Sequence, residues 1–153
     1  MKIGKKNKIN LIGRREFVDF PELMLAHIEA KIDTGAYTSS IHCESISVVF
    51  EHAKPVLYFT VEPNQKDAYR FEHFSQKKIK NSFGEMEERY VIKTLILLGG
   101  KKIRSTISLS NRDNMRYPVL IGRKLIKGKF LIDVSHTHTG GVKIKNVAQF
   151  LNT

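Results

Sequence analysis

Short apolar runs separated by turn-forming residues recur along the chain, and their spacing favours strands over helices. Loose alternation before a turn predicts a strand at residues 25–32, and runs rich in β-branched or aromatic residues predict strands at 40–50 and 56–61. Only residues 21–29 show a competing helical pattern, which is short and weakly capped. The first part of the chain is therefore predicted to be β structure.

The strongest local prediction is a β-hairpin, because the apolar-patterned runs 90–98 and 101–109 are joined by Gly99-Gly100. Three further short elements are predicted, two strands and a helical turn between them: residues 117–121, 130–134 and 123–126. Many short strands with glycine turns are typical of an all-β sandwich or barrel.

Residues 62–89 are polar, mixed in charge and poorly patterned, which predicts either a long loop or a mobile hairpin. No Pro-, Gly- or Ser-rich linker divides the 153 residues. We therefore expect a single domain over 1–153, with 1–7 and 138–153 as peripheral tails.

The cysteine content and the N-terminus predict a cytoplasmic protein. Cys43 is the single cysteine, so no intrachain disulfide can form and a reducing compartment is indicated. Residues 1–15 lack an apolar stretch long enough for a signal sequence. No purely apolar run is longer than 95–98, which is far too short to span a membrane, so no membrane partner is expected.

The charge balance is strongly basic, with 26 Lys and Arg against 15 Asp and Glu. Residues 1–15 hold six bases and no acid, and residues 101–130 hold nine bases and one acid, Asp113. Such a surface attracts polyanions, whether nucleic acid, ribosomes or an acidic peptide. A surface that is merely well solvated would have the same composition.

The run Asp33-Thr34-Gly35-Ala36 places an acid where an apolar strand ends in a tight turn. Gly35 lets the backbone approach closely, and Thr34 offers a short hydroxyl that can hold the loop. A carboxylate held in this way can activate water for attack on a carbonyl. The triplet alone is weak evidence, because Asx turns use the same residues for structural reasons.

A second element, Val119-Leu120-Ile121-Gly122-Arg123, is an apolar strand that ends in glycine. With both elements the chain resembles the retropepsin-like aspartic peptidases, which pair a D-T/S-G-A turn with a later apolar-apolar-glycine element. Residues 28–40 and 117–135 are closer still to a bacterial branch of this family, often labelled ATP-dependent zinc protease and associated with ATP-grasp glutamate ligases. The resemblance spans about residues 8–137. It implies an all-β fold, a closed or nearly closed barrel of retropepsin type with a short helical turn.

The resemblance also implies roles for individual residues. The catalytic residues would be Asp33, Thr34 and Gly35. The substrate-binding residues would be Ala36, Arg116 and Arg123, with Gly122 as structural support of the site.

Two features depart from the family pattern. Retropepsins usually carry an acid four residues after the catalytic Asp, paired with the arginine of the later element. Here that position is Tyr37, so Arg123 must find another partner or point at substrate. Retropepsin flaps are rich in glycine, whereas residues 62–89 contain only Gly84, so closure over a substrate is expected to work differently.

Peptide hydrolysis of this kind needs two carboxylates that share one proton, because like charges in contact cannot both ionise. The chain has one D-T-G, and Asp133 lacks the glycine turn, so a homodimer with one Asp33 per subunit is expected. A monomer with an inactive turn is one alternative. The other is a monomer whose second carboxylate comes from the polar segment: Glu85, Glu87 or Glu88.

The zinc and ATP of the family label find no support in the residues. There is no His-Glu-x-x-His, and one cysteine excludes a multi-cysteine site. His42 and Cys43 would point to opposite faces of a strand, and His136 and His138 are expected to form a polar turn. Without a phosphate-binding glycine loop either, no metal and no cofactor are expected, and any ATP would belong to a partner.

The prediction is an aspartic endopeptidase that hydrolyses peptide bonds through water activated by Asp33 in a homodimer. Its substrate would be a peptide or protein with acidic or glutamylated tails, with a functional link to an ATP-grasp glutamate ligase. The alternative is a non-catalytic basic β-barrel that binds RNA or ribosomes. Bases around the Asp33 cleft would favour the acidic peptide, and a basic stripe on the opposite face would favour nucleic acid.

Overall fold

Six strands of the described residues close into a barrel, in a computed structural model that describes residues 8–81, 83–111 and 116–144. The order around the barrel is β10 (Lys101–Ser110), β4 (Ser39–His42), β11 (Val119–Ile121), β3 (Leu25–Ile32), β2 (Arg15–Phe20) and β9 (Met86–Leu98). The barrel closes because β9 pairs with β10 in the hairpin expected from the sequence. The predicted fold class is confirmed, an all-β fold of retropepsin type with a short helix.

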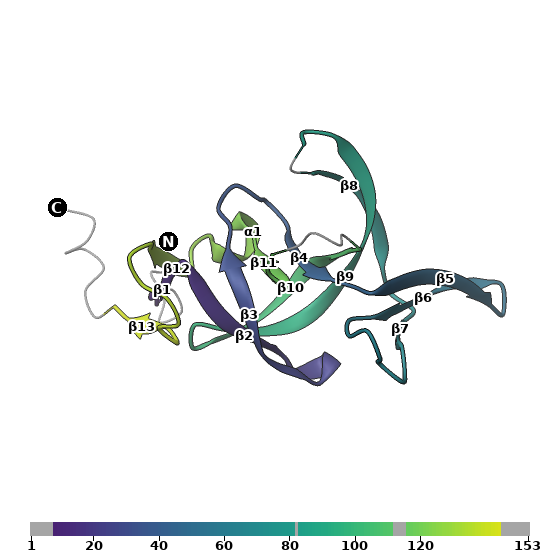
Figure 1. Cartoon of the computed structure of the whole chain (residues 1–153), viewed down its shortest axis with the longest axis horizontal. Coiled ribbons are helices and arrows are strands. Elements are labelled where there is room, and N and C mark those ends of the chain that lie inside the picture. The colour runs from purple at the N-terminus through teal and green to yellow at the C-terminus, as the bar shows by residue number, and fades with distance from the viewer. Residues whose placement is uncertain (1–7, 82, 112–115, 145–153) are drawn as a thin grey trace, which may run out of the picture.

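The remaining strands lie outside this ring (Figure 1). β8 (Ser75–Lys80) pairs with the first half of β9 and arches away from the barrel. A projecting sheet is formed by β5 (Ser45–Glu51), β6 (Lys54–Thr60) and β7 (Tyr69–Phe71). A third sheet is formed by β12 (Phe130–Asp133), β1 (Asn10–Gly13) and β13 (Val142–Lys143). The helical elements are α1 (Arg123–Ile126) and a 3-10 turn at Pro21–Leu23, and no helix of the described residues is long and apolar enough to cross a membrane.

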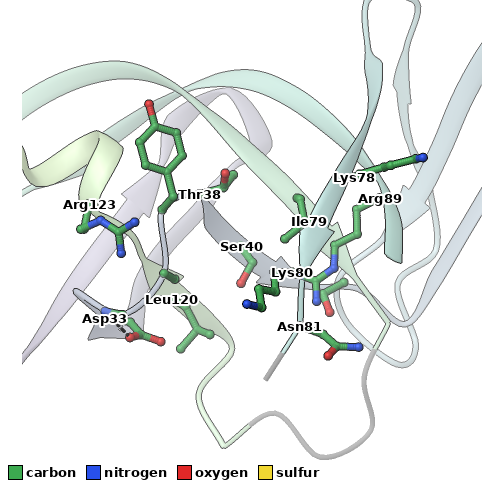
Figure 2. Close-up of a pocket in the computed structure, with 14 residues that line it drawn as sticks. Asp33, Thr38, Ser40, Lys78, Ile79, Lys80, Asn81, Arg89, Leu120 and Arg123 are labelled. Carbon is green, nitrogen blue, oxygen red and sulfur yellow. Dashed lines mark hydrogen bonds between the residues drawn. The ribbon is translucent and has the colours of Figure 1, made fainter. Parts of the chain in front are cut away.

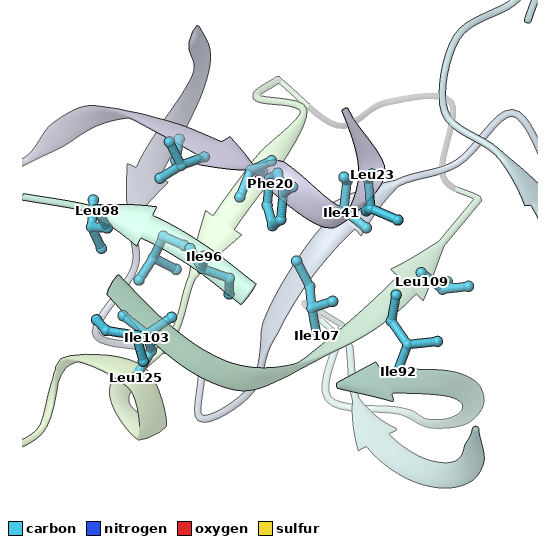
Figure 3. Packing of buried hydrophobic residues seen from close by; sticks show 14 of the residues in the cluster. Phe20, Leu23, Ile41, Ile92, Ile96, Leu98, Ile103, Ile107, Leu109 and Leu125 are labelled. Atoms are coloured by element: carbon cyan, nitrogen blue, oxygen red, sulfur yellow. The ribbon is translucent and has the colours of Figure 1, made fainter. Parts of the chain in front are cut away.

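The core follows from the alternation of side chains along the strands, whose inward residues fill the barrel. Figure 3 shows this packing, with β9 and β10 side by side. The residues of this hydrophobic core are almost completely buried and include Phe20, Leu23, Ile41, Ile92, Ile96, Leu98, Ile107, Leu109 and Leu125. The β9–β10 turn has positive φ at Gly99 (55°) and Gly100 (78°), a conformation that suits glycine and matches the twist of a hairpin.

The structure refines several predicted elements. The run 40–50 is two strands, because the chain leaves the barrel at Cys43 and continues as β5 in the projecting sheet. Within 62–89, a hairpin is formed by β8 and the start of β9, whereas β7 belongs to the projecting sheet. The sequence pattern did not single out β1 or β2.

The segment expected to form a C-terminal tail makes specific contacts where it is described. β13 pairs with β1, and the preceding turn holds a buried carboxylate, so residues 138–144 are not peripheral. Residues 1–7 and 145–153 lie outside the described residues.

That carboxylate belongs to Glu16, whose side chain is almost completely buried. It accepts hydrogen bonds from the N–H groups of Gly13 (2.7 Å), Thr139 (3.1 Å) and Gly140 (3.0 Å), and from the Thr139 hydroxyl (2.6 Å). Burial alone would raise the pKa of Glu16, but these donors favour the charged form and leave the pKa lowered. Glu16 is therefore a structural anion that ties β1 and the C-terminal turn to β2.

We expect Glu16→Gln to lower the free energy of unfolding at pH 7 by about 2–3 kcal/mol, because an amide cannot satisfy all four donors. Since the folded-state pKa lies below the unfolded value, the carboxylate's contribution is present above pH 4.5 and is lost as the pH falls through the folded pKa. Urea denaturation of both proteins at several pH values measures this. The stability difference should shrink in acid, and a constant difference would contradict the assignment.

Candidate active site

Asp33 lies at the end of β3, where β3 runs parallel to β11. Its N–H donates to the Ile121 carbonyl (2.8 Å), and its own carbonyl accepts from the Ala36 N–H (3.2 Å). The Gly35 N–H donates to Asp33 Oδ1 (3.1 Å), while Oδ2 has no hydrogen bond to a described residue. The half-buried carboxylate is thus held by the backbone through one oxygen and offers the other.

Gly122 lies where α1 and the Asp33 loop meet. A Cβ at this position would stand 2.6 Å from the Tyr37 carbonyl oxygen, so any larger residue would push residues 37–38 aside. The Gly122 N–H donates to Ser39 Oγ (3.0 Å), and the Arg123 N–H donates to the Ala36 carbonyl (2.8 Å). Gly122 therefore lets residues 37–38 pass close to the start of α1, at the position for which the resemblance implies structural support.

Arg123 contacts a backbone carbonyl and an aromatic ring, where retropepsins usually have an acid at the position of Tyr37. Its Nη1 donates to the Thr34 carbonyl (2.8 Å), and its guanidinium lies 5.8 Å from the centre of the Tyr37 ring. The side chain therefore bridges the two ends of the Asp33 turn, while its exposed guanidinium still lines the neighbouring cleft.

A cleft of about 560 Å³ separates the Asp33 turn from the β8–β9 hairpin. Figure 2 shows Asp33 and Leu120 on one side of it and Lys78, Ile79 and Lys80 on the other. Among the described residues that line the cleft, Asp33 is the only acid. The bases that line it are Lys78, Lys80, Arg89 and Arg123.

These bases differ in how much of their charge is compensated. Arg89 pairs with Glu87. Lys78 and Lys80 are exposed and make no hydrogen bond or ion pair with a described residue. Glu88 lies opposite Lys78 on β9 but does not line the cleft. The lining therefore holds four bases and one acid, a balance that suits a negatively charged ligand.

The tip of the β8–β9 hairpin is organised by an asparagine. Asn81 Oδ1 accepts from the N–H groups of Phe83 (2.9 Å) and Glu85 (3.0 Å), and the Asn81 N–H donates to the Glu85 carbonyl (2.8 Å). Gly84 has φ 81°, so one glycine suffices for this turn. These hydrogen bonds fix the turn of a hairpin that has only one glycine and that lines one side of the cleft.

Some of the other predicted site residues line this cleft, and the rest lie outside it. Gly35 and Ala36 line the cleft, whereas Thr34 is exposed and its hydroxyl bonds to no described residue. Arg116 lines a separate, smaller cleft. None of the candidate second acids lines the Asp33 cleft: Glu85, Glu87 and Glu88.

The cleft residues of the hairpin were not predicted from the sequence: Lys78, Lys80 and Arg89. A signal was present in the cluster of lysines at 77–80. The charge alone could not show that this segment folds back over Asp33.

The described residues do not suit a metal ion, since no group of three or more His, Cys, Asp or Glu is arranged to hold one. His138 binds Glu29 (2.6 Å) and stacks on Phe17, while His136 faces Asp133 (3.4 Å). Burial raises the pKa of the Cys43 thiol to about 12, so the thiolate that a metal needs is disfavoured.

We therefore expect EDTA or 1,10-phenanthroline to leave any hydrolytic activity unchanged, because no described ligand set would release an ion. The measurement is the rate before and after chelation and dialysis. Activity lost to the chelator and restored by zinc would contradict this expectation.

Comparisons with known proteins agree with this geometry. Residues 11–141 match the model of the RimB-like family, described as retropepsin-like aspartic endopeptidase RimB. The chain is 38% identical over 138 residues to a probable alpha-L-glutamate ligase of Shewanella pealeana, covering 87% of this chain and 30% of that protein. A protein of the same description from Shewanella halifaxensis is 39% identical over 132 residues, covering 83% and 29%. The chain thus spans less than a third of the length of these relatives.

A solved structure has the same fold. The crystal structure of a Legionella pneumophila protein of unknown function matches with a TM-score of 0.66 and 31% identity. The match covers 85% of this chain and 97% of the Legionella chain.

Proposed function

The chain belongs to the RimB-like family of retropepsin-like aspartic endopeptidases, and from this premise we propose that it hydrolyses peptide bonds in acidic protein segments with Asp33 as its catalytic carboxylate. The observation that carries the proposal is the cleft in which this acid faces several bases. An acid alone would suit many roles, but an acid held at a strand end and open to a cleft suits water activation.

The proposed reaction uses the Asp33 carboxyls of two subunits. One, as carboxylate, takes a proton from water while the water oxygen attacks the peptide carbonyl carbon. The other, protonated, donates its proton to the carbonyl oxygen, which gives a neutral tetrahedral intermediate. Collapse of this intermediate breaks the C–N bond, and the leaving nitrogen takes the proton that the first carboxylate acquired. As the carbonyl of the new carboxylic acid forms, a hydroxyl of the intermediate returns its proton to the second carboxylate. The pair returns to its shared-proton state.

The bases of the hairpin favour an acidic substrate. Lys78 and Lys80 place positive charge across the cleft from Asp33, and a run of glutamates would neutralise it. This distribution supports the acidic peptide over nucleic acid. It also agrees with relatives that are described as probable alpha-L-glutamate ligases, and we propose a functional link in which a ligase adds glutamates that this protein removes.

The test is to incubate the purified protein with a peptide that ends in several glutamates and with the same peptide ending in glutamines. Mass spectrometry of the products locates each cleaved bond. The proposal expects shortened products from the glutamate peptide and few from its glutamine counterpart. Intact peptides across a range of pH and protein concentration would contradict it.

A further inference from the structure

A second, basic cleft of about 280 Å³ lies beside β3, the strand that leads to Asp33, on the side where β3 pairs with β2. The residues that line it are Arg14, Arg15, Lys31, Ile32, Arg116 and Tyr117. None of these described lining residues is an acid, so four cations share one small concave surface.

Most of this charge is uncompensated. Lys31 is exposed and bonds to no described residue, and Arg14 donates only to the neutral Val134 carbonyl (3.0 Å). Arg116 lies 6.0 Å from the centre of the Tyr117 ring. Arg15 has an acidic neighbour, Glu29 Oε1, at 3.9 Å, but Glu29 is bound more closely by a histidine.

The register of the barrel connects this cleft to the first one. Residues opposite one another on neighbouring strands form a row: Ser40 pairs with Leu120, Leu120 with Lys31, and Lys31 with Arg15. Paired residues share one face of a sheet, so the row leads across the outer face from the Asp33 cleft, lined by Ser40 and Leu120, to the basic cleft.

The spacing of this row suits a peptide. Neighbouring strands lie about 4.8 Å apart, which puts the backbone at Lys31 roughly 5 Å and that at Arg15 roughly 10 Å from Leu120. An extended peptide advances about 3.3 Å per residue. The bond to be cleaved would lie in the Asp33 cleft, which Leu120 lines. Counted from there, a substrate side chain about two to four residues from that bond would reach the basic cleft.

We propose that this basic cleft binds a substrate carboxylate about two to four residues from the bond cleaved at Asp33, and so selects acidic peptides. The inference rests on the proposed function and adds a subsite that determines specificity for an acidic residue of the substrate. Arginine suits this task because its planar guanidinium binds a carboxylate through two parallel hydrogen bonds. Nucleic acid fits less well, since Tyr117 is the only aromatic ring among the described lining residues and Arg116 lies against it.

Lys31→Gln is the cleanest test, because it removes a charge without breaking a described hydrogen bond. The ratio of kcat/KM for a glutamate-tailed peptide to that for its glutamine counterpart should fall about five- to tenfold, and further in Lys31→Gln/Arg116→Gln. The control is Lys102→Gln, an exposed charge of β10 that lines neither cleft, which should keep the wild-type ratio.

Binding separates this inference from the proposed reaction. A fluorescein-labelled glutamate-tailed peptide should bind Asp33→Asn protein more tightly than it binds Asp33→Asn/Lys31→Gln protein, even if no peptide is ever cleaved. Equal affinity of these two proteins, or an equal loss with Asp33→Asn/Lys102→Gln, would overturn the site. A single-stranded RNA of equal charge that binds as tightly as the peptide, and is weakened as much by Lys31→Gln, would also overturn it. Loss of cleavage with the affinity difference preserved would refute only the reaction.

Discussion

Asp33→Asn is expected to abolish peptide hydrolysis, by at least about a thousandfold, and to leave the fold intact. Asparagine keeps the shape of the side chain, and its Oδ1 can still accept the Gly35 N–H bond. It cannot take a proton from water, so the step that generates the nucleophile is lost. The turn is half-buried to exposed, and we expect the free energy of unfolding to change by less than about 1 kcal/mol.

The measurement is kcat on an accepted peptide, with circular dichroism and thermal melting to follow the fold. The matched control is Asp133→Asn. Asp133 is a half-buried acid whose pKa is lowered by hydrogen bonds from the Ser135 hydroxyl and N–H, and it does not line the Asp33 cleft. The control should keep its activity. An Asp33→Asn protein that retains wild-type turnover would remove Asp33 from the mechanism.

The second large effect concerns the oligomer. The described part of the cleft supplies one carboxylate where the proposed reaction needs two, and the turn that bears it is partly exposed, with Tyr37 59% accessible. We therefore expect activity to reside in a symmetric dimer in which two Asp33 turns meet. Specific activity should fall on dilution below the dimer dissociation constant, because a monomer lacks the second acid.

Subunit mixing tests the same point without dilution. In a roughly tenfold excess of Asp33→Asn subunits, nearly all wild-type subunits enter mixed dimers, and activity per wild-type subunit should fall to about a tenth. The variant Asp133→Asn in equal excess should not have this effect. Analytical ultracentrifugation at the assay concentrations supplies the oligomeric state. A monomer with constant specific activity would show that the second acid comes from the same chain, where Glu85 and Glu88 would be tested next.

Local sequence pattern was enough for the features that depend on neighbouring residues. The strand that leads to Asp33 follows from alternation, and the hairpin at Gly99-Gly100 follows from the positive φ of its two glycines. The helical turn after Gly122 was also predicted at its observed position. With the resemblance of two motifs, these features sufficed for the barrel class and the family.

The site needed long-range pairing that no local pattern encodes. The polar hairpin faces Asp33 because β8 pairs with a β9 that continues beyond the barrel, so Lys78 and Lys80 enter the cleft from more than forty residues along the chain. Arg123 binds the Thr34 carbonyl instead of an acid, a contact that exists only once α1 packs against the turn. Arg116 was expected to bind substrate beside Asp33, but it lies before β11 and lines the neighbouring cleft with Lys31 and Arg15. The sequence by itself determined which acid is presented and on what turn. The tertiary structure decided which charges surround it, since that depends on which strands lie side by side.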